Sequence, residues 1–147
     1  MRCVIARICN QVKFYACWAR LKDMTGGNGP DVIYDPVGGA YSELALRSIA
    51  WKGRHLVVGF AAGEIPRIAL NLILLKGGAL VGVAWGHFMA REPARNKANI
   101  EQLLQWFAAG KLKPVVSETF TLANAPRAME KMLKREVQGK VVILPGA

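Results

Sequence analysis

One stretch of the sequence constrains the fold more than any other, the segment 31–39, which reads Asp-Val-Ile-Tyr-Asp-Pro-Val-Gly-Gly. Its residues Val32, Ile33 and Tyr34 form a β-branched and aromatic run, which is typical of a strand buried in a parallel sheet. The proline and the two glycines that follow are turn residues and end the strand. A chain with this cassette is expected to build a sheet whose parallel strands alternate with helices.

The sequence after the cassette continues this alternation. Helices are predicted over 41–50, 70–75, 94–109 and 125–135, and strands over 56–58, 79–85, 115–120 and 140–144. Weaker patterns predict a strand over 2–9 and a helix over 11–24. No hairpin turn joins the predicted strands, which favours parallel βαβ crossovers. The predicted fold class is therefore α/β, a partial Rossmann (parallel, doubly wound) sheet with a C-terminal return segment.

The charge pattern bears on which partners the chain binds. The formal net charge is +10, from 20 basic and 10 acidic residues. Residues 1–29 hold five basic and one acidic side chain, and residues 91–113 and 127–140 each hold five basic and two acidic ones. Nucleic-acid-binding surfaces concentrate their charge in one stripe. Solvated helix faces are therefore favoured, a basic lining for a phosphorylated cofactor comes second, and nucleic acid is a distant third.

Neither a membrane span nor a metal site is expected. A membrane-spanning helix needs ~18–20 apolar residues, whereas the best apolar run, 68–75, is short and contains Asn71. Arg7 interrupts the apolar N-terminal stretch, so no signal peptide is expected and the predicted location is cytoplasmic. The three cysteines form no CxxC pair, and neither His55 nor His87 has a neighbour at ligand spacing, so no metal site is predicted.

Several sequence blocks together carry a family resemblance. In chain order they are Tyr-Asp-Pro-Val-Gly-Gly at 34–39, Gly-Arg at 53–54 with Val-Val-Gly-Phe at 57–60, Asn-Leu-Ile-Leu-Leu-Lys-Gly at 71–77, Val-Gly-Val-Ala-Trp-Gly at 81–86, Gly-Lys-Leu-Lys-Pro at 110–114 and Gly-Lys-Val-Val-Ile-Leu-Pro at 139–145. Their shared order is more specific than any one motif. From about residue 21 to residue 145 the chain resembles the C-terminal part of the zinc-independent NADPH:quinone oxidoreductases of the medium-chain dehydrogenase/reductase superfamily.

The resemblance implies a domain organisation and a reaction. Family members have a catalytic domain resembling a GroES barrel, then a Rossmann domain that binds NADPH, then a segment that returns to the catalytic domain. Mapped in this way, residues 1–29 are unassigned, 30–113 form a partial nucleotide-binding domain, and 114–147 form the return segment. The catalytic domain and the first Rossmann strand with its glycine fingerprint are expected to be missing. The family reaction is hydride transfer from NADPH to a quinone or enone, in which the cofactor carries the chemistry.

Five residues that follow the ends of two predicted strands are candidates for cofactor binding. Open parallel sheets bind ligands at the carboxyl ends of their strands. Val37, Gly38 and Gly39 follow the first strand, and glycine lets the backbone approach a cofactor closely. An ordinary strand-to-helix turn is the alternative. The resemblance implies that Phe60 and Ala61, after the next strand, pack against the nicotinamide half of NADPH. For Phe60, core packing is nearly as well supported.

Two more candidates follow from the resemblance. Trp85, at the predicted end of the third strand, would lie near the nicotinamide carboxamide or in a dimer interface. Arg135 would contact the NADP phosphate, although a solvated arginine is favoured there. No catalytic residue is predicted: Asp35 is expected to cap its strand rather than act as a general base, and His55 is expected to be structural or exposed.

The resemblance predicts a quinone-oxidoreductase-like protein that uses NADPH but turns over weakly or not at all by itself. The reason is that a helix N-terminus to anchor the pyrophosphate is missing. The alternative is a non-catalytic module that forms homo-oligomers through the sheet edges at 115–120 and 140–144. A basic nucleic-acid-binding protein is less favoured. The electron acceptor and the choice between NADPH and NADH stay open.

Overall fold

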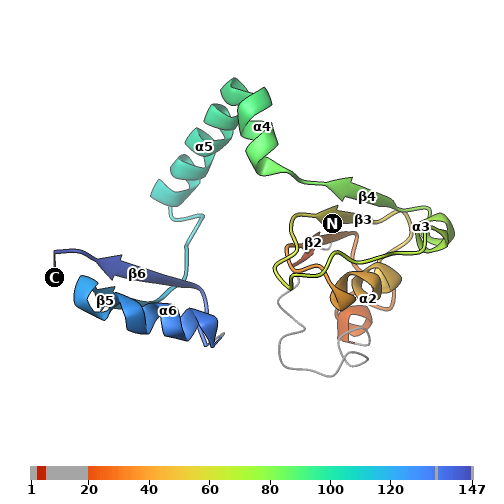
Figure 1. The fold of residues 1–147 in the computed structure, drawn as a ribbon. Helices are drawn as coiled ribbons and strands as arrows, with labels where there is room; N and C mark the ends of the chain where they lie inside the picture. The colour runs from red at the N-terminus through yellow and green to blue at the C-terminus, as the bar shows by residue number, and fades with distance from the viewer. Residues whose placement is uncertain (1–2, 6–19, 135, 147) are drawn as a thin grey trace. The chain divides into compact units, whose positions relative to one another are not determined.

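A computed structural model describes residues 3–5, 20–134 and 136–146 (Figure 1). The chain divides into two compact units, Met1–His87 and Phe88–Ala147.

The first unit is built on a four-stranded parallel sheet. Its strands are β1 (Cys3–Ile5), β2 (Val32–Asp35), β3 (Arg54–Val57) and β4 (Ala79–Gly82), which lie in the order β1-β2-β3-β4. The helices α2 (Ala40–Ser48) and α3 (Asn71–Lys76) form the crossovers between β2, β3 and β4. This arrangement confirms the predicted α/β class with its parallel sheet.

Helix α2 covers one face of this sheet (Figure 1). Three fully buried side chains, Ile33 of β2 with Leu46 and Ile49 from α2 and its C-terminal end, form the centre of the core. Residues two apart on a strand point to the same face, so Asp35 lies on the helix-covered face together with Ile33. The register of β2 against β3 brings His55 beside Ile33 on this face.

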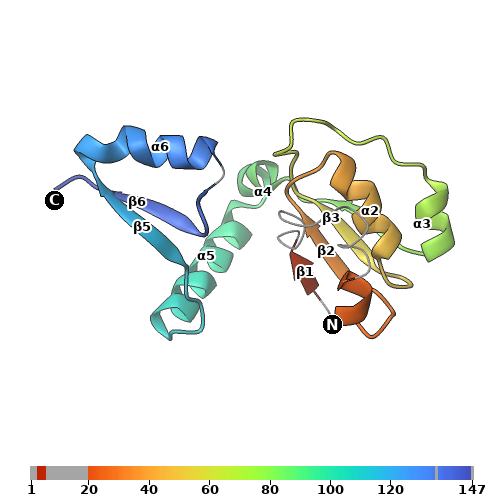
Figure 2. The same cartoon turned by 90° about the horizontal axis from the view of Figure 1, so that it is seen from below.

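The second unit contains a smaller parallel pair of strands. Helix α4 (Trp85–Arg91) spans the division between the units, and α5 (Pro93–Ala108) follows it. Then come β5 (Val116–Thr121), the 3-10 turn η2 (Leu122–Asn124), α6 (Ala125–Leu133) and β6 (Lys140–Leu144). Strands β5 and β6 are parallel, and α6 runs alongside them as the crossover (Figure 2). The side chains of Lys131 and Glu118 form an ion pair of 2.6 Å that ties α6 to β5.

The end of the third strand differs from the prediction. The sequence predicts a strand over 79–85, but β4 ends at Gly82 and Trp85 begins α4. The Val83 N–H still donates to the Val57 carbonyl at 2.9 Å. Because Val57 is the last residue of β3, no further strand backbone is left for residues 84 and 85 to pair with. Among the helices of the described segments, none is long and apolar enough to cross a membrane.

Candidate functional site

The candidate site begins at the turn that leads from β2 into α2. Gly38 and Gly39 have φ angles of 71° and 61°. Residues other than glycine rarely adopt backbone angles in this region. Gly39 is also the N-cap residue of α2. The backbone therefore requires both glycines, whether or not a ligand approaches the turn.

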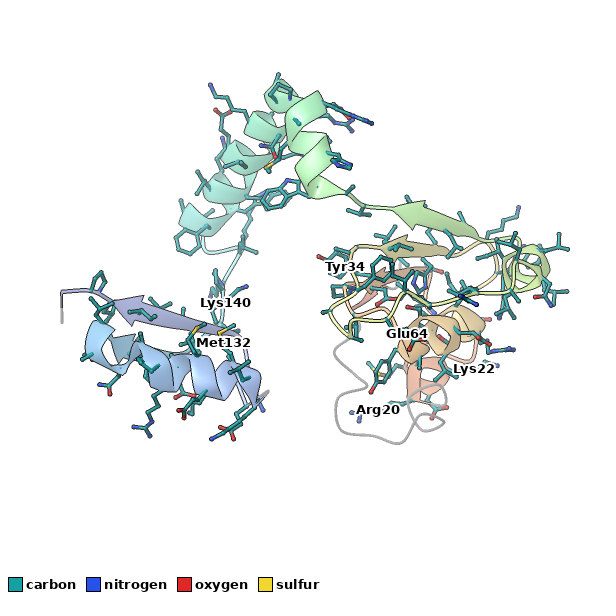
Figure 3. All side chains as sticks on the ribbon, viewed as in Figure 1. Arg20, Lys22, Tyr34, Glu64, Met132 and Lys140 are labelled. Carbon is teal, nitrogen blue, oxygen red and sulfur yellow. The ribbon has the colours of Figure 1, made fainter. Side chains whose placement is uncertain are left out.

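A second loop, residues 59–64, pairs with this turn through its backbone. Three hydrogen bonds join them: the Ala61 N–H to the Pro36 carbonyl (3.1 Å), the Ala62 N–H to the Val37 carbonyl (2.8 Å), and the Gly39 N–H to the Glu64 carbonyl (3.1 Å). Figure 3 labels Glu64, which lies near α2. Two segments that follow neighbouring strands are thus held as one surface at the carboxyl edge of the sheet.

The ring of Phe60 packs directly on Gly38. A Cβ atom added to Gly38 would lie 2.7 Å from the Phe60 Cδ1 atom, and one added to Gly39 would lie 3.2 Å from the Ala62 Cβ atom. Phe60 therefore fills the space on the side of Gly38 where a Cβ atom would stand. Gly38 and Gly39 are buried, whereas Phe60 is 39% exposed and Ala61 is exposed. Phe60 and Ala61 form the outer layer of this surface.

The side chain of Asp35 binds the backbone of the turn at residues 37–38. This side chain is 6% exposed, and its two carboxylate oxygens have four neighbours within hydrogen-bond distance. The Val37 and Gly38 N–H groups each donate to Oδ1 at 3.0 Å, the Ser42 hydroxyl donates to Oδ2 at 2.5 Å, and His55 Nε2 lies 3.1 Å from Oδ2. This confirms the prediction that Asp35 caps the end of its strand.

These contacts set the protonation state of Asp35. Burial opposes the charged form and by itself raises the pKa of the carboxyl group. The hydrogen bonds from His55, Ser42 and the backbone of Gly38 and Val37 outweigh burial and hold the pKa of Asp35 well below its usual range. Asp35 is therefore a fixed carboxylate with no spare proton at neutral pH, which does not suit a general acid.

His55 is the functional candidate that the sequence pattern did not single out. The imidazole is 1% exposed, and its Nδ1 atom is buried without a hydrogen-bond partner in the described structure. Sequence reasoning left open whether His55 is structural or exposed, and the structure shows it buried. No local sequence signal identifies His55, because its contact with Asp35 depends on the register between β2 and β3.

Of the remaining two candidates, the structure describes only Trp85. Trp85 is 61% exposed and begins α4, beyond the carboxyl end of β4. Arg135 lies outside the described residues. Within the described ranges, no three His, Cys, Asp or Glu side chains are grouped so that they could hold a metal ion.

The fit of a nicotinamide dinucleotide to these residues is partial. The exposed ring of Phe60 and the exposed backbone around Ala61 offer a flat apolar face suited to one side of an aromatic ring. The pyrophosphate would need free N–H groups at a helix N-terminus. At α2 the N–H of the N-cap residue Gly39 is bonded to the Glu64 carbonyl and is not free for a phosphate. The described residues therefore offer a face for the nicotinamide ring, and the N-cap N–H of α2 adds nothing to a phosphate site.

Comparison with known proteins gives one consistent family. The family model described as "Zinc-binding dehydrogenase" matches residues 11–143. The quinone oxidoreductase-like protein 2 homolog of Nematostella vectensis is 39% identical over 84% of this chain and 34% of its own length, and the Bos taurus quinone oxidoreductase-like protein 2 is 34% identical over 82% and 34%. A mycobacterial structure solved as a complex with NADPH is 25% identical, with a TM-score of 0.76 over 90% of this chain and 41% of its own. The chain spans about a third of the length of the curated relatives it matches.

Proposed function

Given that the chain belongs to the zinc-binding dehydrogenase family, we propose that it carries the nicotinamide-side half of an NADPH site of the quinone-reductase type. The observation that carries the proposal is the joined surface at the carboxyl edge of the sheet. There, Phe60 and Ala61 lie on the glycine turn that follows β2, at the edge where open α/β sheets bind ligands.

The proposed chemistry is that of the quinone oxidoreductases which the chain resembles. NADPH, when bound, supplies a hydride to a quinone or enone acceptor, and the protein supplies positioning. Residues 30–113 would then be the partial nucleotide-binding domain, and residues 114–147 the segment that completes a catalytic domain. The reaction would be zinc-independent. The surface of Phe60 and Ala61 would bear on one face of the nicotinamide ring, with Trp85 beyond the end of β4.

This chain is expected to turn over weakly or not at all by itself. A dinucleotide site draws much of its affinity from the pyrophosphate at a helix N-terminus, and the sequence has no G-x-G-x-x-G fingerprint to open such a helix after a strand. Among its described residues the chain also presents no acid–base pair that is open to solvent beside the site, since Asp35 and His55 are both buried. Clear NADPH-dependent quinone reduction by the purified chain would contradict this expectation.

The test is a titration of the purified chain with NADPH and, separately, with NADH, followed by tryptophan fluorescence. Trp85 is exposed near the carboxyl edge of the sheet, so a bound nicotinamide is expected to quench part of the signal. A Phe60→Ala variant is the matched control, because it removes the proposed stacking face and leaves every tryptophan in place. Saturable quenching that Phe60→Ala weakens supports the proposal. Equal quenching in both proteins would contradict it.

A second candidate is an interaction module that forms homo-oligomers through its sheet edges. It is favoured by the position of β4, which has no neighbour on its outer side among the described strands. Leu80 and Val81 of this strand are more than a third exposed. Open apolar edges invite pairing with another chain. The two candidates are compatible, because a second copy would pair with β4 while Phe60 stays exposed at the ends of the strands.

A further inference from the structure

We propose that His55 is a positioning residue, which acts through Asp35 to hold the glycine turn and the 59–64 loop in the conformation that presents Phe60. The inference deepens the proposed nicotinamide site and rests on it for its functional meaning. It concerns a residue that is only 1% exposed and whose hydrogen bond is to Asp35.

The Asp35 carboxylate uses its whole hydrogen-bonding capacity. An ionised carboxylate offers about four acceptor positions and no donor. Here Oδ1 takes the two turn N–H groups, and Oδ2 takes the Ser42 hydroxyl. His55 Nε2, at 3.1 Å from Oδ2, occupies the remaining position. The carboxylate is therefore fully engaged, and half of its donors belong to the turn itself.

The surroundings of His55 select one form of its ring. Nδ1 is buried with no partner in the described structure, so a proton on Nδ1 would be a buried donor without an acceptor, which is costly. The neutral ring with its proton on Nε2 avoids this cost and donates to Asp35. This donation is the one hydrogen bond that the described structure gives the ring.

The donor, and not the packing, distinguishes histidine at this position. The register neighbours of His55 are Ile33 on β2 and Leu80 on β4. A leucine would suit these apolar neighbours at least as well. What a leucine cannot supply is the proton for Oδ2, and without it a buried charge loses one of its four donors.

The effect on the site follows the hydrogen bonds outward. Asp35 binds the N–H groups of Val37 and Gly38, and the ring of Phe60 packs on Gly38. The same turn is bonded to the 59–64 loop at Ala61 and Ala62. A carboxylate that is free to rotate would therefore weaken the hydrogen bonds that fix the turn. The contact between Gly38 and the ring of Phe60 would then be less well fixed.

The test compares His55→Leu with His55→Gln in the full chain. Leucine removes the donor, whereas glutamine keeps an N–H group at the end of a side chain of similar reach. Amide hydrogen exchange is followed by NMR at Val37 and Gly38. Ala50, whose N–H donates to the Pro30 carbonyl at the other end of α2, serves as the reference amide.

We expect His55→Leu to speed exchange at Val37 and Gly38 by about tenfold or more relative to Ala50, because a hydrogen bond to a charged group is lost. His55→Gln is expected to restore most of the protection. Equal acceleration at all three amides would mean a general loss of stability and would overturn the proposal. Unchanged exchange at Val37 and Gly38 in His55→Leu would also overturn it.

A measurement on the unmodified chain keeps the proposal testable if the leucine variant fails to fold. The ¹⁵N chemical shifts of the His55 ring are expected to show a protonated Nε2 and an unprotonated Nδ1, and a proton on Nδ1 with a bare Nε2 would overturn the proposal. The cofactor enters only in a last step. Absence of NADPH binding by the unmodified chain would refute the proposed function, whereas the exchange and ring measurements would still decide the role of His55.

Discussion

The backbone of Gly38 lies against the ring of Phe60 so closely that a Cβ atom at position 38 would stand 2.7 Å from the ring Cδ1 atom. Gly38 follows β2 and Phe60 follows β3, so this contact locks together the ends of two neighbouring strands. The exposed side of the Phe60 ring is the part of this contact that a ligand can reach. The central claim is that this surface supports one face of a nicotinamide ring.

Gly38→Ala is expected to destabilise the first unit for two reasons. The φ angle of 71° costs a residue with a Cβ atom about 1–2 kcal/mol, and the new methyl group would collide with Phe60. Urea denaturation followed by circular dichroism measures the total loss of unfolding free energy.

Gly26→Ala is the matched control for this prediction. Gly26 has a similar φ angle of 62°, but a Cβ atom added there meets nothing within 4 Å. The loss for Gly38→Ala is expected to exceed that for Gly26→Ala, and the excess is expected to shrink when Phe60→Ala is added. If the two single variants lose the same free energy, the contact between Gly38 and Phe60 is not a tight one.

Asp35→Asn is expected to destabilise the fold at neutral pH by about 2–3 kcal/mol, because the amide cannot accept all the hydrogen bonds that the carboxylate accepts. The pKa of folded Asp35 is lowered from an unfolded value of about 3.9. Ionised Asp35 therefore stabilises the fold fully above that unfolded value, and this stabilisation is lost as the pH falls through the folded pKa.

Urea titrations of both proteins at pH values from 7 down to about 3 test the sign of this effect, since the linkage appears as the pH falls below the unfolded pKa. The gap in unfolding free energy between the unmodified chain and Asp35→Asn is expected to stay constant down to the unfolded pKa and to narrow below it. A gap that widens as the pH falls would contradict the lowered pKa.

Gly82→Pro is expected to weaken any self-association through β4. The N–H groups of Ala79 and Val83 donate to β3, so the alternating pattern of the strand points the N–H of Gly82 outward, where proline removes a donor that a second chain would need. Sedimentation velocity over a range of concentrations is the measurement.

The control for this variant is Gly86→Pro, which lies in the first turn of α4, where proline is tolerated. Both glycines have open space around them. Association that Gly82→Pro abolishes and Gly86→Pro leaves intact supports pairing at the edge of β4. A chain that sediments as a monomer at every concentration contradicts the interaction-module alternative.

The parallel sheet could be predicted from the sequence because its signal is local and repeated. The β-branched run before Asp35 and the glycine turn after it define a strand and a crossover without reference to any other part of the chain. The end of β4 could not be predicted in this way. The run of apolar residues continues to Trp85, but the strand stops at Gly82 because its neighbour β3 has ended at Val57. Strand length here depends on the partner strand, which a local pattern does not contain.

The candidate residues could be named from the sequence, whereas the contacts between them could not be predicted. Residues 37–39 could be named because open parallel sheets bind ligands at the carboxyl ends of their strands. Phe60 and Ala61 could be named from the family resemblance. The link between Asp35 and His55 spans 20 positions in the sequence and depends on the register between β2 and β3. The packing of Phe60 on Gly38 is equally non-local. It places an aromatic ring on the side of Gly38 where a Cβ atom would stand.

The most direct test of the central claim is a titration of the ¹⁵N-labelled chain with NADPH, followed residue by residue in amide spectra. Saturable shifts are expected, largest at Phe60 and Ala61 and smaller at the buried Gly38. Phe60→Ala is expected to raise the dissociation constant for NADPH about fivefold or more, the loss expected when an aromatic stacking contact worth about 1 kcal/mol or more is removed. Absence of shifts at millimolar NADPH, or shifts confined to residues away from the carboxyl edge of β2 and β3, would contradict the proposed nicotinamide site.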